Sequence, residues 1–456
     1  VVQPPFPPGK SGDFPMGLEV GDQLAQQYMK DHPGVTIKLD QWVPPAGQDA
    51  DQWRLAQVQA GTSPHVMVRG IKETYTWVGR ADFFVPITDH IEQPDPYVAG
   101  NKRWGDLLPA DIAGRNKAPD GKSYMMPHEQ RIGELMVYNK DVFDELGLKP
   151  FETWNQVFAG LEKVRTQGKY TPYDTWLETF PFNIWSDTLL TKGFLADVDQ
   201  DKNGFYDIKE WTRVMRQGKF KADSYFFLHS LQLWKRLVPY FQKDWPTIAG
   251  RGGEGYKLFL AGKAAMCNAV PTLAVRLEAD TARKFQFGFF TWPQLDRDLA
   301  PEFPKDEEMP YISSRRPDVN SMIVLKRAKS ENLVDLAVDF IQYWTAPENF
   351  KKLLDEATTK APSFTFIPVQ GDLKPIRIPP EMLKGQLRRL YGVDMWGVRF
   401  YDDWFEAVKK YMGDVLPEDQ AIKTWQGLID KAAENAVKDF KWDEDDRKWR
   451  AEVGKA

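Results

Sequence analysis

The chain of 456 residues is long enough to bury the cores of about two or three domains. Its hydrophobic content of 42% and charged content of 27% are typical of a globular protein, and a net charge of −5 without a basic run argues against nucleic acid as a partner. A single cysteine, Cys267, excludes an intramolecular disulfide and a multi-cysteine metal site.

Helices and strands are predicted to alternate in the first quarter of the chain. After a Pro- and Gly-rich start, apolar spacing predicts, in order, a helix over 17–29, a strand over 35–42, a helix over 53–60, a strand at 66–68, a helix around Trp77 and a strand at 85–87. This alternation predicts parallel sheets in an α/β fold, in which ligands bind beyond the carboxyl ends of strands. The side chains that follow predicted strands are therefore the first ligand candidates: Trp42, Arg69, His128 and Glu129.

Residues 121–154 predict a crossing between two lobes. A short apolar run ends at Pro127, a polar tract follows over 128–131, and a second apolar run occupies 135–138. The amphipathic helix that comes next ends before Gly147, the residue type that favours a left-handed C-cap. This order is typical of a chain that leaves one α/β lobe and starts another. Two strands of one sheet joined by a loop are the alternative.

The rest of the chain continues the α/β pattern. The predicted helices are 154–165, 224–240, 255–261, 332–344 and 417–437, and the predicted strands are 266–268, 285–290 and 320–325. Residues 175–190 are rich in aromatic side chains, and 392–405 form a predicted loop dense in Trp, Arg and Asp. Residues 438–456 are predicted to be a charged, frayed end.

Four blocks resemble a known family. Residues 138–154 contain YNKDVF, LGLKP and TW, residues 259–266 read FLAGKAAM, and residues 337–350 read AVDFIQYWTAPENF. Residues 61–66 read GTSPHV, with His65 where the family usually has Asp. Together and in this order they resemble the family 1 extracellular solute-binding proteins, the carbohydrate-capturing subunits of bacterial ABC importers.

The resemblance implies a two-lobed, type II periplasmic-binding-protein-like α/β fold with a hinge between the lobes. The first lobe would hold residues 1–130 and 293–355, and the second would hold 131–292 and 356–456. The implied function is capture of a carbohydrate, with an oligosaccharide as the expected ligand and acidic sugars included because of the candidate arginines. The lobes would close on the ligand, and a membrane permease of an ABC transporter would recognise the closed form.

The resemblance further implies a monomeric binder, not an enzyme, located outside the cell or in the periplasm. No apolar run reaches the about 18 residues that span a bilayer. The sequence begins at Val1 without a signal peptide, which suggests a removed leader and leaves room for lipid attachment to the cell membrane. The competing class is a secreted glycan-active hydrolase or lyase that uses Glu129, or Asp402 with Asp403. A surface adhesin is a third class.

The candidate ligand residues combine aromatic and polar side chains. The chain has 17 tryptophans, and indole rings stack on the C–H faces of sugars. The stacking candidates are Trp176, Trp185, Trp292 and Trp396. The candidates for polar contacts are Arg69, His128, Glu129, Asn268, Arg316 and Arg399. The family's aromatic contact after its GKAAM block has no counterpart in residues 268–273, NAVPTL.

Residues 199–210, DQDKNGFYDIKE, match the EF-hand calcium loop at each defined position. In such a loop Gly204 permits the sharp turn. The predicted ligands are the side chains of Asp199, Asp201, Asn203, Asp207 and Glu210 and the backbone carbonyl of Phe205. We expect one structural Ca²⁺ that stiffens the second lobe and takes no part in chemistry. A solvated acidic turn is the alternative.

Overall fold

The computed structural model divides the chain into two compact units. Unit 1 contains Val1–Arg131, Ala274–Ala279 and Asp318–Ile378, and unit 2 contains Ile132–Leu273, Asp280–Pro317 and Pro379–Ala456. The structure describes residues 1–4, 18–42, 44–45, 50–70, 83–109, 112–113, 116–118, 120–132, 135–175, 197–200, 208–247, 256–269, 276–290, 292–306, 308–309, 315–360, 366–368, 370–371 and 398–453. Each unit has its own hydrophobic core and its own sheet.

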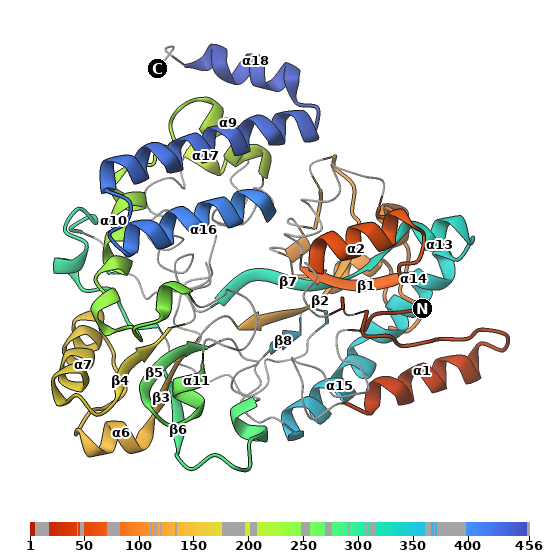
Figure 1. Ribbon diagram of the computed structural model, residues 1–456. Helices are drawn as coiled ribbons and strands as arrows, with labels where there is room; N and C mark the ends of the chain where they lie inside the picture. Colours follow the sequence, from red (N-terminus) through yellow and green to blue (C-terminus); the bar gives the residue numbers. More distant parts are fainter. Residues whose placement is uncertain are drawn as a thin grey trace. The chain divides into compact units, whose positions relative to one another are not determined.

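The sheet of unit 1 has the strand order β1-β7-β2-β8 (Figure 1). Its strands are β1 Val66–Gly70, β2 Met125–Ile132, β7 Arg315–Val324 and β8 Phe366–Pro368. β1 runs antiparallel to β7, with Val66 opposite Val324 and Gly70 opposite Asn320. β2 runs antiparallel to β8. This register brings side chains from distant parts of the sequence to the same sheet end.

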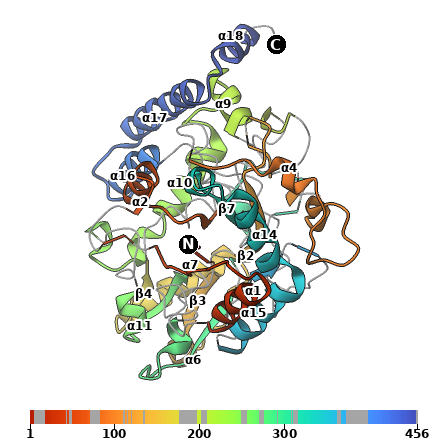
Figure 2. The same cartoon turned by 90° about the vertical axis from the view of Figure 1, so that its right-hand side faces the viewer.

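The helices of unit 1 contribute apolar side chains to the same core as this sheet. They are α1 Val20–Asp31, α2 Ala50–Gln59, α4 Thr88–Ile91, η1 Trp104–Leu107, α13 Lys326–Ser330, α14 Val334–Thr345 and α15 Pro347–Lys360. α1 lies beside α15 in both views (Figure 1 and Figure 2). The Tyr28 hydroxyl of α1 donates to Asp339 of α14 at 2.5 Å, and Tyr97 donates to the same oxygen at 2.8 Å. The first bond joins α1 to α14, and the second joins the segment around Tyr97 to α14.

The sheet of unit 2 has the strand order β4-β5-β3-β6. Its strands are β3 Leu135–Asn139, β4 Thr171–Asp174, β5 Ala264–Ala269 and β6 Phe287–Phe290. β3 runs antiparallel to both of its neighbours, and β4 runs parallel to β5. β3 therefore begins at the sheet end where β4, β5 and β6 finish.

The first helices of unit 2 form where local signals predict them. α6 Lys140–Glu145 follows β3, and the Asn139 side chain accepts hydrogen bonds from the backbone N–H groups of Asp141 and Val142. The predicted left-handed C-cap is confirmed, because Gly147 has a φ of 60°. α7 Trp154–Gln167 starts at the N-cap Thr153.

The other helices of unit 2 include a C-terminal group. The set consists of α9 Ile208–Arg216, α10 Tyr225–Lys235, η2 Val238–Tyr240, η3 Trp245–Thr247, α11 Lys257–Leu260, η4 Arg297–Leu299, α16 Val398–Met412, α17 Glu418–Asp439 and α18 Asp443–Glu452. α17 contacts α9, α16 and α18. The expected loop over 392–405 is wrong from Val398 onward, because α16 begins there.

The expectation of a frayed end over 438–456 is also wrong, because α18 forms there. Arg216 of α9 donates to both carboxylate oxygens of Asp446, at 2.6 and 3.0 Å, and both side chains are largely buried. The indoles of Trp442 and Trp449 join the core of unit 2. These long-range contacts stabilise a helix whose own composition is highly charged.

The prediction of parallel sheets is wrong for most described strand pairs, of which only β4–β5 is parallel. Two predicted strands are reduced to isolated bridges. The segment 35–42 contributes Leu39, which pairs with Val2, and the strand expected at 85–87 is replaced by a bridge between Phe84 and Leu325. Helix–strand alternation does not reveal pairing direction when the chain passes between sheets.

The unit boundaries differ from the predicted lobes at the return crossings. The first division falls after Arg131, whereas the later segment of unit 1 begins at Asp318 and not at residue 293. The apolar side chains of Leu295, Leu299 and Phe303 are buried in the core of unit 2, which keeps their loop there. β8 extends unit 1 beyond residue 355, because it pairs with β2.

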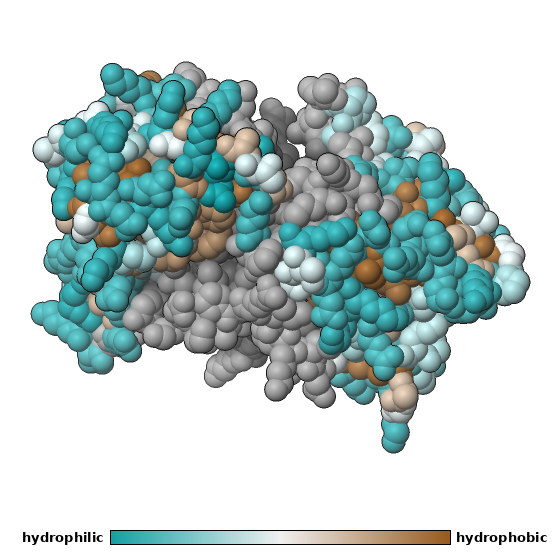
Figure 3. Space-filling model, turned by 90° about the horizontal axis from the view of Figure 1, so that it is seen from below, coloured by the Kyte–Doolittle hydropathy of each residue, from teal (hydrophilic) through white to brown (hydrophobic). Residues whose placement is uncertain are grey.

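The described residues on the face seen from below are mainly polar (Figure 3). In the view from below, hydrophobic residues are interspersed among hydrophilic ones (Figure 3). Among the described large hydrophobic side chains, Val415 and Val453 are exposed. Every helix in the described part of the chain is too short or too polar to cross a bilayer.

Candidate ligand site

Two of the predicted ligand residues, Asn268 and Trp292, lie at the same end of the unit 2 sheet. Asn268 of β5 lies opposite Met136 of β3, and Phe290, the last residue of β6, also lies opposite Met136. Trp292 follows two residues after β6. Asp174, the last residue of β4, is paired with Cys267, so β4 ends there too. This is the carboxyl-terminal end of three strands, where the α/β rule predicts a ligand.

Asn268 is a polar side chain held in a buried setting. The residue is 2% exposed, and its Oδ1 atom accepts a hydrogen bond from the Tyr173 hydroxyl at 3.2 Å. Tyr173 is itself buried on β4, where its ring lies 5.5 Å from that of Phe241. The Asn268 amide is therefore oriented by a residue of the neighbouring strand.

The last residue of β4 and the one after it are also anchored by hydrogen bonds. The Asp174 carboxylate accepts from the backbone N–H of Phe259 at 2.8 Å, at the start of α11. Burial raises the pKa of Asp174 to about 7, against the effect of the backbone donors. The Gln242 side chain accepts from Thr175 N at 2.8 Å and donates to Thr175 O at 2.7 Å.

Trp292 belongs to the core of unit 2 and does not offer a free face for stacking. It is fully buried, and its ring centroid lies 5.7 Å from that of Trp154. The backbone explains this placement, because Gln294 accepts from Trp154 N and donates to Glu152 O. Two reciprocal bonds pull the end of β6 onto the start of α7, so we assign Trp292 to packing and not to sugar contact.

The candidates of unit 1 cluster on β1, β2 and β7. Arg69 lies opposite Ser321 and is half-buried. Glu129 is buried, and its carboxylate accepts a hydrogen bond from the Asn320 amide. Asn320, which the sequence analysis missed, lies opposite Gly70 on β7. Its position near Arg69 is a consequence of strand register, which the sequence does not reveal.

His128 points into a packed environment. It is 1% exposed, and its ring meets the ring of Phe350 on α15 edge-to-face at 5.5 Å. This packing favours a core role for His128 over ligand contact. Arg316 lies on β7 and Arg399 on α16, but their side chains are outside the described atoms, and Trp176, Trp185 and Trp396 lie outside the described residues.

The predicted calcium loop is described at its two ends only. Asp199 and Glu210 are described, and Glu210 accepts a hydrogen bond from Gln200 N at 2.8 Å. Asp201, Asn203, Phe205 and Asp207 lie outside the described residues. Within the described ranges, no three His, Cys, Asp or Glu side chains gather to hold a metal ion. The calcium site stays a prediction.

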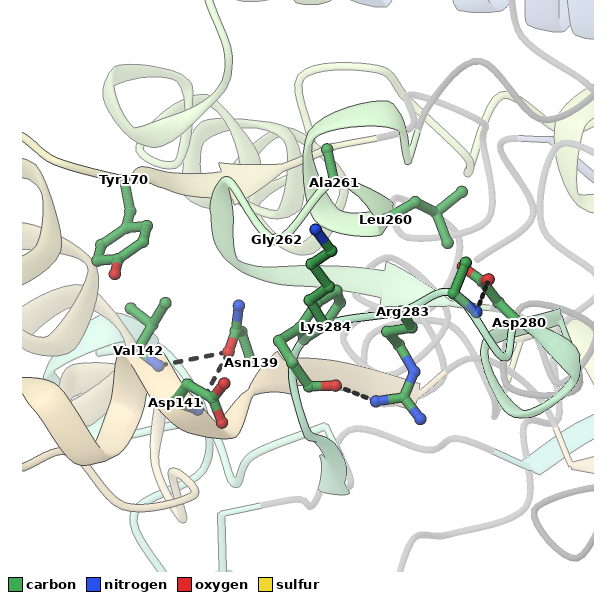
Figure 4. Close-up of a pocket in the computed structure, with 12 residues that line it drawn as sticks. Asn139, Asp141, Val142, Tyr170, Leu260, Ala261, Gly262, Asp280, Arg283 and Lys284 are labelled. Carbon is green, nitrogen blue, oxygen red and sulfur yellow. Dashed lines mark hydrogen bonds between the residues drawn. The ribbon is translucent and has the colours of Figure 1, made fainter.

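A pocket of about 400 Å³ lies at the opposite end of the unit 2 sheet (Figure 4). Its walls include Asn139, Asp141, Tyr170, Gly262, Arg283 and Lys284. These residues lie at the end of β3, at the start of α6, or just before β4, β5 and β6, so none was a sequence candidate. The Arg283 guanidinium lies 4.6 Å from the centroid of Phe287 and donates to the Phe285 carbonyl. The pocket is thus separate from the strand end that carries Asn268.

The fold is similar to those of several solved binding proteins. The ABC substrate-binding protein Lmo0181 from Listeria monocytogenes, in complex with cycloalternan, is 16% identical with a TM-score of 0.62 and covers 91% of this chain and 96% of its own. The sugar transporter BL01359 from Bacillus licheniformis, in complex with stachyose, is 15% identical (TM-score 0.56; 91% and 96% covered). The apo-form of RafE from Streptococcus pneumoniae is 17% identical (TM-score 0.58; 91% and 95% covered). The chain therefore has the two-lobed, type II periplasmic-binding-protein-like fold.

The sequence also identifies the family. Residues 23–368 match the family described as bacterial extracellular solute-binding protein, and this match spans more than half of the chain. The chain belongs to that family. No protein of curated function gives a significant sequence match.

Proposed function

We propose that the protein captures a carbohydrate outside the cytoplasm and delivers it to the permease of an ABC importer. The observation that carries this proposal is the family match over residues 23–368. Two similar folds were solved in complex with oligosaccharides, cycloalternan and stachyose, which supports an oligosaccharide as the ligand. Acidic sugars belong to the proposal because Arg69, Arg316 and Arg399 remain candidates for polar contacts.

In this proposal the protein acts by binding alone. Asn268 at the end of β5 and Arg69 at the end of β1 contribute polar contacts. The candidates for stacking are Trp176, Trp185 and Trp396. Ligand binding draws the lobes together by a hinge motion, and the permease recognises the closed form. The protein works as a monomer, and lipid attachment would keep it at the cell membrane.

Oligosaccharides are expected to raise the melting temperature of the protein. A ligand that binds only the folded state adds about 2.7 kcal/mol at a hundredfold excess over Kd. The measurement is a thermal-shift panel with stachyose, raffinose, cycloalternan, chitin oligosaccharides and uronic-acid oligosaccharides, with cellobiose and free amino acids as controls for size and for solute class. A selective shift with one oligosaccharide class supports the proposal. Shifts with amino acids alone would contradict it.

The same samples distinguish binding from the competing hydrolase or lyase. The carboxylate of Glu129 is buried against Asn320, whereas Asp403 is exposed on α16. A binder leaves the sugar unchanged, and we expect full recovery of the oligosaccharide by chromatography after overnight incubation. Conversion of the sugar by the wild type, abolished in Glu129→Gln or Asp403→Asn, would establish an enzyme instead.

We also propose that residues 199–210 bind one structural Ca²⁺. The support is the complete match of the loop pattern and the helix α9 that starts at Ile208 inside it. Calorimetry on chelator-treated protein should show binding of one Ca²⁺ per chain, and Glu210→Gln should weaken it at least tenfold because the bidentate carboxylate is lost. Glu444→Gln, an exposed glutamate on α18, is the matched control. Absence of any calcium heat in the wild type would overturn this proposal.

A further inference from the structure

Three consecutive residues at the end of β4 are each held by a different element of unit 2. Tyr173 donates to Asn268 of β5, Asp174 accepts from the first turn of α11, and Thr175 is bonded twice by Gln242. The three residues and their side-chain partners Asn268 and Gln242 are all buried, and Tyr173 and Thr175 are fully so. A buried network of this kind holds its members in one arrangement. It lies at the sheet end where the proposed function places the ligand.

The bond from Tyr173 decides what Asn268 can offer to a ligand. A side-chain amide has an acceptor oxygen and a donor nitrogen, and the bond that the Tyr173 hydroxyl donates to the oxygen fixes the direction in which the nitrogen points. Within the described chain, the Nδ2 atom of Asn268 makes no hydrogen bond to protein. It is also not one of the fully buried side-chain atoms that lack a hydrogen-bond partner. Asn268 is thereby oriented as a hydrogen-bond donor.

We propose that Tyr173 is a positioning residue that holds the Asn268 amide so that its Nδ2 donates to an oxygen of the bound oligosaccharide. This inference rests on the proposed function and assigns the kind of contact. Hydroxyl, ring and glycosidic oxygens of a sugar all accept hydrogen bonds, so a fixed amide donor suits this ligand class. Without Tyr173, the amide loses its buried partner and can rotate, which presents the oxygen in place of the nitrogen.

A double-mutant cycle on sugar affinity tests the inference. Tyr173→Phe keeps the ring against Phe241 and removes only the hydroxyl, and we expect Kd to rise about fivefold to tenfold. Asn268→Ala should raise Kd about tenfold or more. Because Tyr173 acts through Asn268, adding Tyr173→Phe to Asn268→Ala should change Kd less than twofold. The readout is a fluorescence titration with the panel sugar that binds the wild type most tightly.

Tyr170→Phe is the matched control, because it removes a hydroxyl bonded to Glu145 at 2.8 Å near the other end of the same sheet. Its Kd should equal that of the wild type. Melting temperatures report whether each variant is folded. If Asn268→Ala does not fold, Asn268→Asp replaces it, since the aspartate still accepts from Tyr173 but lacks the Nδ2 donor.

The outcomes separate this inference from the proposed function. Equal effects of Tyr173→Phe in the wild-type and Asn268→Ala backgrounds would show a general structural role and overturn the inference. So would sugar binding that survives Asn268→Ala and Asn268→Asp unchanged. Both results leave the proposed function intact. Absence of binding to every sugar in the wild type would overturn the proposed function itself.

Discussion

A Trp292→Ala variant should lose about 3–5 kcal/mol of the free energy of unfolding of unit 2, the usual cost of deleting a buried indole. Trp292 is fully buried, and its ring packs against that of Trp154 at 5.7 Å. Backbone bonds from Gln294 join this segment to the start of α7, which limits how far the segment can move to fill the space. Urea unfolding followed by circular dichroism measures the loss.

Two further variants separate packing from ligand contact at this position. Trp292→Phe fills most of the same space and should cost about 1–2 kcal/mol while leaving sugar affinity unchanged. Trp53→Ala, a half-buried tryptophan of unit 1, should cost less than Trp292→Ala. If Trp292→Phe instead keeps full stability and abolishes sugar binding, the indole acts as a ligand contact and our assignment to the core is wrong.

Asp174 should make the protein less stable as the pH rises from about 4 to about 7. Burial raises the pKa of this carboxyl to about 7 in the folded chain, whereas an unfolded aspartate titrates near about 3.9. Between those values the folded state holds a proton that the unfolded state has lost. Stability is therefore full below the unfolded pKa and falls by about 1.4 kcal/mol per pH unit until the folded pKa is reached.

The comparison of wild type with Asp174→Asn isolates this effect. The asparagine oxygen still accepts from Phe259 N, but the side chain cannot ionise. The difference in free energy of unfolding between the two proteins should shift by about 2–3 kcal/mol from pH 5 to pH 8, in favour of the variant at high pH. Asp95→Asn in unit 1 is the matched control. Burial raises the pKa of Asp95 to about 6, so the stability difference between wild type and Asp95→Asn should stop changing about one pH unit lower than that for Asp174→Asn. A constant difference across the range would show that Asp174 titrates normally.

Local signals surround the crossing from unit 1 to unit 2. The polar tract 128–131 ends where the units divide after Arg131, and the run 135–138 becomes β3. The residues that end and cap the following helices, Asn139, Gly147 and Thr153, act through their own side chains or backbone preferences. Such signals are local, so a single sequence is enough to place them.

The structure places the sequence candidates in the fold, and their contact with a ligand stays a prediction. Asn268 was a candidate at the end of the predicted strand 266–268, and it does lie at a strand end with Asp174. The sequence offered no sign that Tyr173 would bond to it, because the two residues are 95 positions apart and meet only through the β4–β5 register. Trp292 satisfied the same rule as Asn268, yet the attachment of its loop to α7 places it in the core.

The sequence by itself determined the family, the α/β class and the positions of most helices, because these depend on apolar periodicity, caps and short motifs. Only the tertiary structure decided that most of the described strand pairs are antiparallel, that the loop after Trp292 stays with unit 2, and that α18 folds onto α9. Each of these depends on contacts between residues far apart in the chain. These contacts gain their energy from packing and burial between segments that the fold brings together. A local sequence pattern therefore does not predict them.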